Sequence, residues 1–224
     1  AKAKAFSEER SFDLCYYPGI NANEANRFNI LDEPYFFMGA KALIGAEREA
    51  RIASTMQSLS LLFLDPGRGL ERAEQSIERN HAARLTWVEA FASSIAGILH
   101  TVLGDADEAR ARYEQALALQ RRIGDREGAG LSLGGLAQLA SASGDIAAAL
   151  DLYRSALAAF EEVGDRAEEA RILGEMAWAY LAESDVPRAR ATFFDAVQAH
   201  QDVASVRGVG LSLIGLAAAE VADG

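Results

Sequence analysis

From about residue 46 onward, apolar residues recur at the spacings of three, four and seven that mark one face of an α-helix. The same pattern returns every 40 residues without a gap. Equivalent positions form matched series, namely Tyr113, Tyr153 and Phe193; Leu133, Leu173 and Leu213; and Ala137, Ala177 and Ala217. Each 40-residue repeat holds two helical stretches, so the pattern predicts pairs of antiparallel helices repeated along the chain.

The turns between these helices have a repeated chemistry of their own. Gly104-Asp105 recurs as Gly144-Asp145, and Ser184-Asp185 stands one step further along. Glycine adopts the left-handed conformation that ends a helix, and aspartate then caps the free N–H groups that open the next. We expect helices at about 47–63, 68–82, 86–103, 106–122, 126–142, 146–163, 166–182, 187–203 and 206–222.

Residues 1–45 do not follow the repeat and form a separate region in our division of the chain. They hold eight of the aromatic residues, and a short helix is expected after Pro34. Two interpretations stay open. The segment is either a degenerate repeat that caps the N-terminal end of the array, or an aromatic segment that lies against the groove or a neighbouring domain.

Composition restricts the partners and the compartment. The net charge of −11 argues against nucleic acid and against anionic lipid, because both require a basic surface. The longest apolar runs, such as Leu59 to Leu64, are too short to span a bilayer. Cys15 is the only cysteine and no signal peptide is apparent, so we expect a cytoplasmic protein without disulfides that binds no membrane.

No sequence pattern typical of catalysis or cofactor binding is present. His81, His100 and His200 are not at ligand spacing from one another or from the cysteine, which favours structural roles and predicts no metal site. The glycines between Gly128 and Gly135 fall within a predicted helix, so they do not form a dinucleotide-binding loop. We therefore expect no catalytic residue and no cofactor, and an enzyme is the least favoured class of function.

The repeat resembles the tetratricopeptide repeat. Leu173, Met176, Ala177 and Tyr180 match the pattern of its first helix, and Ala149, Tyr153 and Ala156 match that of its second. The resemblance covers residues 46–224 and implies an all-α, right-handed superhelical solenoid of antiparallel helix pairs. The 40-residue period is longer than the usual one and is similar to the extended subgroup of kinesin light chains, animal G-protein regulators and bacterial signalling proteins. HEAT-type repeats, with periods of similar length, are the alternative.

In this family the first helices of the pairs line a binding groove, which implies a protein- or peptide-binding scaffold. On our alignment, the candidate groove residues are Arg51, Phe91, Ile98, Gln138, Arg171 and Trp178. Arginine and aromatic side chains dominate many interfaces, although Phe91 and Ile98 fit packing between helices equally well. The family's Lys/Asn clamp for a terminal carboxylate is absent at these positions.

Two functions remain after this comparison. The leading hypothesis is an interaction or regulatory module of a larger bacterial signalling or transcription-regulatory protein. The alternative is a small-molecule-sensing effector domain of such a regulator, with the ligand enclosed by the groove. The helix expected at 206–222 is apolar nearly all round, so we expect it to be covered by a second copy of the chain, as a homodimer, or by a following repeat.

Overall fold

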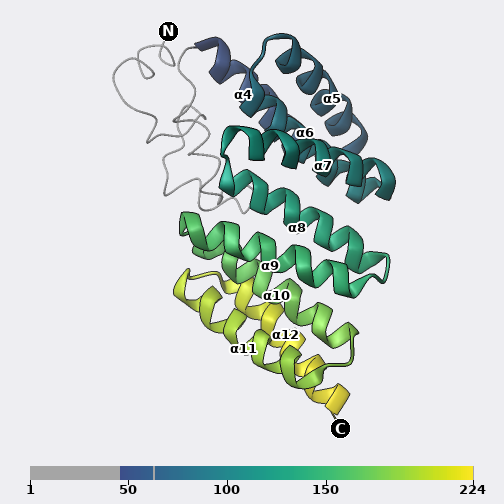
Figure 1. Cartoon of the computed structure of the whole chain (residues 1–224), viewed down its shortest axis with the longest axis vertical. Coiled ribbons are helices and arrows are strands. Elements are labelled where there is room, and N and C mark those ends of the chain that lie inside the picture. Colours follow the sequence, from purple (N-terminus) through teal and green to yellow (C-terminus); the bar gives the residue numbers. More distant parts are fainter. Residues whose placement is uncertain (1–45, 63, 224) are drawn as a thin grey trace. The chain divides into compact units, whose positions relative to one another are not determined.

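The computed structural model describes residues 46–62 and 64–223, with side chains from residue 50 onward. Throughout this part of the chain the regular elements are α-helices (Figure 1). They are α4 (Ala46–Ser60), α5 (Pro66–Ala82), α6 (Thr86–Leu103), α7 (Ala106–Ile123), α8 (Arg126–Ala142), α9 (Ile146–Val163), α10 (Arg166–Ala182), α11 (Val186–Asp202) and α12 (Val206–Asp223). The two interpretations of residues 1–45 fall outside the described residues.

The helices predicted from the 40-residue pattern are confirmed, with ends that differ by three residues at most. The largest difference is in α4, which ends at Ser60 and not at residue 63. A turn hydrogen bond from the Leu61 N–H to the Ser58 carbonyl, 3.2 Å long, closes this helix early. Hydrophobic periodicity therefore located the helices well, because each buries one apolar face.

The predicted junction chemistry is also confirmed. Gly144 takes a positive φ of 86°, and Asp145 then accepts a hydrogen bond from the Ala148 N–H at 3.1 Å to open α9. Ser184 adopts the same left-handed conformation, with a φ of 63°, although a side chain makes it less favourable there. The turns are therefore fixed by local capping, independently of which residue stands at the left-handed position.

The chain divides into two compact units, the first ending at Leu119 and the second beginning at Gln120. In unit 1, α5 packs on α4 and on α6. The core between these helices includes Ile52, Met56, Val88, Ile95 and Leu99. Helix α6 is the one described helix with the length and apolarity to cross a membrane, but 67% of Thr86–Leu103 is buried inside the protein. Its apolarity in this fold is that of a core helix.

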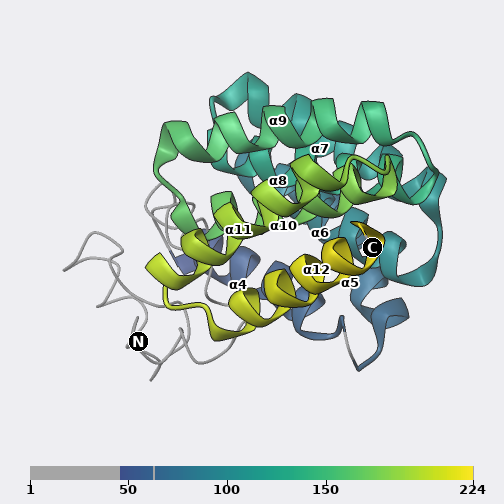
Figure 2. The same ribbon diagram turned by 90° about the horizontal axis from the view of Figure 1, so that it is seen from below.

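In unit 2, each of the helices from α8 to α12 packs on the next (Figure 2). Helix α10 also contacts α8 and α12, so the first helices of successive pairs lie side by side. Tyr153 and Phe193 are buried at equivalent positions on α9 and α11, and Tyr113 of unit 1 is buried at the third such position. Both units therefore show stacked antiparallel helix pairs. The superhelical handedness stays a prediction.

Candidate interaction surfaces

One face of unit 2 carries three of the six predicted groove residues. We define the first-helix face as the surface of Leu131, Gln138, Arg171, Trp178 and Leu211, on α8, α10 and α12. Gly134 of α8 lies against Arg171 of α10, since a Cβ at Gly134 would be 3.3 Å from the Arg171 Nη2. The Gln138 Nε2 donates to the Glu175 Oε1 at 3.4 Å, also from α8 to α10. Helix α10 also contacts α12, so the three helices lie side by side.

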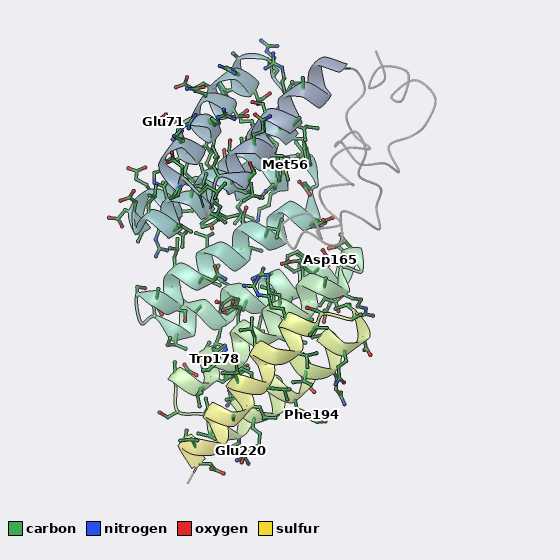
Figure 3. The ribbon with its side chains drawn as sticks, turned by 180° about the vertical axis from the view of Figure 1, so that it is seen from behind. Met56, Glu71, Asp165, Trp178, Phe194 and Glu220 are labelled. Atoms are coloured by element: carbon green, nitrogen blue, oxygen red, sulfur yellow. The ribbon has the colours of Figure 1, made fainter. Side chains whose placement is uncertain are left out.

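Trp178 is the most exposed aromatic side chain of this face. It is 42% exposed, and its ring meets the buried ring of Phe193 edge-on at a centroid distance of 5.1 Å. Figure 3 shows Trp178 near one end of α10 and Asp165 at the other. A large ring that is fixed on one side and open on the other fits an anchor for a partner, because little side-chain entropy is lost on binding.

Arg171 lies two turns before Trp178 and has a structural role that the sequence pattern did not predict. Its Nη2 is 2.6 Å from the Glu168 Oε2, and its Nε donates to the same oxygen at 2.8 Å. Glu168 is buried in the first turn of α10, whereas about a third of the Arg171 side chain is exposed. Arg171 therefore compensates a buried carboxylate and also presents positive charge at the surface.

Behind the face, Glu175 interacts with the hydroxyl of Tyr153. Burial, with a further contribution from the charge of Glu175, raises the pKa of the Tyr153 hydroxyl above its usual value. The phenol is therefore a neutral hydrogen-bond donor throughout the physiological pH range. This interaction fixes the Glu175 carboxylate, and Glu175 in turn accepts from Gln138.

Unit 1 contains a cavity that no pattern in the sequence predicted. Its volume is about 460 Å³, and it is lined by Ala50, Arg51, Ser54, Ser76, Arg79, Asn80 and Ala82 of α4 and α5. The Arg51 Nη1 donates to the Arg79 carbonyl at 3.3 Å and lies 3.5 Å from the Asn80 Oδ1. Arg51, predicted as a groove residue, therefore lines this cavity together with a second arginine.

Phe91 and Ile98 pack between helices, which is the alternative to a groove position that the sequence left open. Phe91 is buried in the core of unit 1 and stacks on Trp87 at a centroid distance of 5.3 Å. Ile98 packs against the same core and is only partly buried. Packing between helices accounts for both side chains. Periodicity could not separate groove from core here, because the two arcs adjoin on the same helix.

The pKa shifts of two titratable side chains, Asp165 and His200, come from packing and helix capping. Burial raises the pKa of the Asp165 carboxyl, while its bond from the Glu168 N–H acts in the opposite direction. Burial lowers the pKa of His200, which lies against Gly208 at the start of α12. The His81 Nδ1 lies 2.9 Å from the Glu89 Oε1. Among the described residues, no group of three or more His, Cys, Asp or Glu side chains could hold a metal ion.

The antiparallel helix pairs and capped turns are features of a known repeat family. Residues 87–162, about a third of the chain, match the family described as Tetratricopeptide repeat. This segment carries the sequence pattern of tetratricopeptide repeats. The match spans α6 to α9, and helices of similar length continue on both sides of it. The matching family is a repeat scaffold and not an enzyme family, and no curated protein matches the chain.

Solved structures show the same fold. BtubC (BKLC) of P. vanneervenii superimposes with a TM-score of 0.66 at 18% identity, covering 99% of this chain and 83% of that chain. A second similar structure is that of a Podosopora anserina protein assigned as a kinesin light chain, with nearly identical TPR-like repeats. It superimposes with a TM-score of 0.62 at 18% identity, covering 76% of this chain and 85% of that chain. A variant of that protein with a single substitution gives the same values. At this identity the likeness shows the fold alone, an array of stacked antiparallel helix pairs. The family match over residues 87–162 favours tetratricopeptide over HEAT repeats.

Proposed function

We propose that the chain is a scaffold that binds a protein or peptide segment on the first-helix face of unit 2. Tetratricopeptide repeats are in general protein-interaction modules, and the matched region gives this chain the same architecture. A regulatory role within a larger bacterial signalling or transcription-regulatory protein, in the cytoplasm, is part of the proposal. It rests on the sequence resemblance and on the acidic, cysteine-poor composition.

The observation that carries the proposal is the position of Trp178. A 42% exposed indole stands on the same helix face as Arg171, and the exposed side chain of Leu211 lies on neighbouring α12. An aromatic anchor bordered by an arginine and an aliphatic residue is a composition found at the centres of protein interfaces. A segment with an apolar residue for Trp178 and an acidic residue for Arg171 would fit this surface.

The test is selection of peptides from a random display library on the immobilised protein, followed by affinity measurement by titration calorimetry. We expect Trp178→Ala to weaken the selected peptides by more than about 1 kcal/mol, the range for an interface anchor. Ala158→Ser, on the exposed side of α9, is the matched control and should bind as the unchanged protein does. Failure to select any peptide, or equal affinity of the Trp178→Ala variant, would contradict the proposal.

A second candidate function is supported by the cavity of unit 1. Two arginines and the buried amide of Asn80 line a space of about 460 Å³, which is the size of a small-molecule site. Such a lining favours an anionic ligand, as expected for a sensor domain. A thermal-shift screen with carboxylates and phosphate esters tests this function. The sensor hypothesis requires a stabilising ligand whose effect is lost in the Arg79→Gln variant, and peptide binding at Trp178 should not require that ligand.

A further inference from the structure

Helix α12 leaves a long apolar stripe exposed. The stripe consists of Val206, Gly210, Leu213, Ile214, Ala217 and Val221, all exposed and all on one side of the helix. The opposite side is occupied, because Gly208 and Gly215 lie directly against His200 and Phe193 of α11. An apolar stripe along a whole helix is far more extensive than the single exposed apolar side chains of an ordinary surface.

The central positions of the stripe, Gly210, Leu213 and Ala217, are equivalent to packing positions of α8, namely Gly130, Leu133 and Ala137. Leu133, which lies 80 residues before Leu213, is 6% exposed, whereas Leu213 is 49% exposed. Ala137 and Ala177, equivalent to Ala217, are fully buried. In α8, a Cβ at Gly130 would meet the Phe160 ring of α9, and one at Gly134 would meet the Ile172 side chain of α10. The central positions of the α12 stripe are therefore equivalent to helix–helix contact positions, and the described residues of unit 2 leave them exposed.

The stripe is also palindromic. Val206 and Val221 are equidistant from the midpoint between Leu213 and Ile214, and the small residues Gly210 and Ala217 are equidistant from it as well. An antiparallel copy of the same helix would therefore meet valine with valine, a small residue with a small residue, and the central leucine and isoleucine at the two-fold axis. Self-complementarity of this kind is what an isologous dimer interface requires.

The charged residues of α12 leave the centre of the stripe free. Arg207 and Glu220 lie on opposite flanks of the stripe, and Glu220 and Asp223 pair with Arg190 of α11 at 2.7 and 2.8 Å. The centre of an antiparallel pair would therefore hold no charged side chain.

We propose that α12 binds α12 of a second copy of this chain, as an antiparallel two-fold pair centred between Leu213 and Ile214. The dimer extends the proposed scaffold function by joining two peptide-binding faces. It does not depend on what binds at Trp178, so Trp178→Ala should remove peptide binding and leave the dimer intact.

The first test is the mass in solution, measured by light scattering after size exclusion over a range of concentrations. The full chain should rise from 24.0 kDa toward twice that mass as the concentration increases. Gly210→Arg should remain at the monomer mass. Within the described part of the chain, no heavy atom lies within 4 Å of a Cβ at Gly210, and any residue but proline favours helix more than glycine, so this variant should fold.

The matched control is Ala158→Arg, which adds the same charge to the exposed side of α9 and should dimerise as the unchanged chain does. Circular dichroism and thermal melting establish that both variants are folded. A chain that stays monomeric at every concentration would overturn the proposal, whether or not a helix of some other protein covers the stripe. So would a dimer that persists unchanged in Gly210→Arg.

The second test addresses the register. In a Cys15→Ser background, Ile214→Cys places a thiol beside the two-fold axis, where it should be joined efficiently to its own copy by a short bismaleimide. Ala158→Cys, exposed on α9, should give no cross-linked dimer. Dimerisation without preferential cross-linking at position 214 would overturn the antiparallel register.

Discussion

Gly130 of α8 lies against the ring of Phe160 of α9: a Cβ at Gly130 would be 2.8 Å from the Phe160 Cζ. Phe160 is fully buried, so the ring has little room to retreat. We expect Gly130→Ala to lower the free energy of unfolding by roughly 1–3 kcal/mol, the usual range for overpacking a core. Urea denaturation followed by circular dichroism measures this change.

Gly210 provides a matched control, because it occupies the position equivalent to Gly130 two repeats later and the described residues leave open space around it. Gly210→Ala should raise the stability of dilute protein by up to about 1 kcal/mol, through helix propensity alone. We predict that the two substitutions change the free energy of unfolding in opposite directions. If both variants are stabilised to the same extent, the contact between Gly130 and Phe160 is not the tight one described.

The ring of Tyr153 should be a major contributor to the stability of unit 2. It is 1% exposed, so Tyr153→Ala should cost about 3 kcal/mol or more through the cavity it leaves. Tyr153→Phe keeps the ring, as Phe193 does at the equivalent position, and removes only the interaction with Glu175. Tyr153→Phe should therefore lower the free energy of unfolding by only about 1 kcal/mol. A loss below roughly 1 kcal/mol for Tyr153→Ala would contradict the buried position.

Arg171 should be needed for stability because of the carboxylate that it compensates. Arg171→Ala leaves the buried Glu168 without this partner. It should lower the free energy of unfolding by roughly 2 kcal/mol. The double variant Glu168→Ala/Arg171→Ala should regain much of that loss, since no buried charge remains at this pair. A double-mutant cycle in urea measures the coupling between the two residues. If the losses are simply additive, the ion pair contributes nothing to folding.

His200 should make the stability of unit 2 depend on pH. Burial holds its pKa in the folded chain below the ordinary value of 6.5, so on acidification the unfolded chain takes up a proton before the folded chain does. The stabilising effect of neutral His200 is therefore fully present above pH 6.5 and is lost as the pH falls toward the lowered pKa. Unfolding measured across this window should show the decline.

The comparison variant is His200→Phe, since Phe160 fills the equivalent position one repeat earlier. It should reduce the decline in stability between neutral and mildly acidic pH. An NMR titration of the His200 ring measures the pKa directly. A value at or above 6.5 in the folded protein would contradict the predicted sign.

The binding roles of the candidate interaction residues stay predictions, and the structure shows where their side chains lie. Sequence spacing placed Arg171 and Trp178 two turns apart on one helix, and the structure has both on the first-helix face. The same spacing placed Phe91 on the groove side, but its ring is buried against Trp87. The binding role of Arg51 stays a prediction. Its place beside Arg79 depends on the packing of α4 on α5, which no pattern within a single helix specifies.

The sequence by itself determined the local features of the chain. The 40-residue period and the capped turns defined the helices and their order, because capping and amphipathicity act within a few residues. Only the tertiary structure decided which face of each helix is covered. Leu133 of α8 and Leu213 of α12 occupy equivalent positions in the repeat, yet Leu133 is buried and Leu213 is exposed. The physical difference is the helix that follows α8 and packs on it, since burial depends on neighbours that a residue's own helix does not contain.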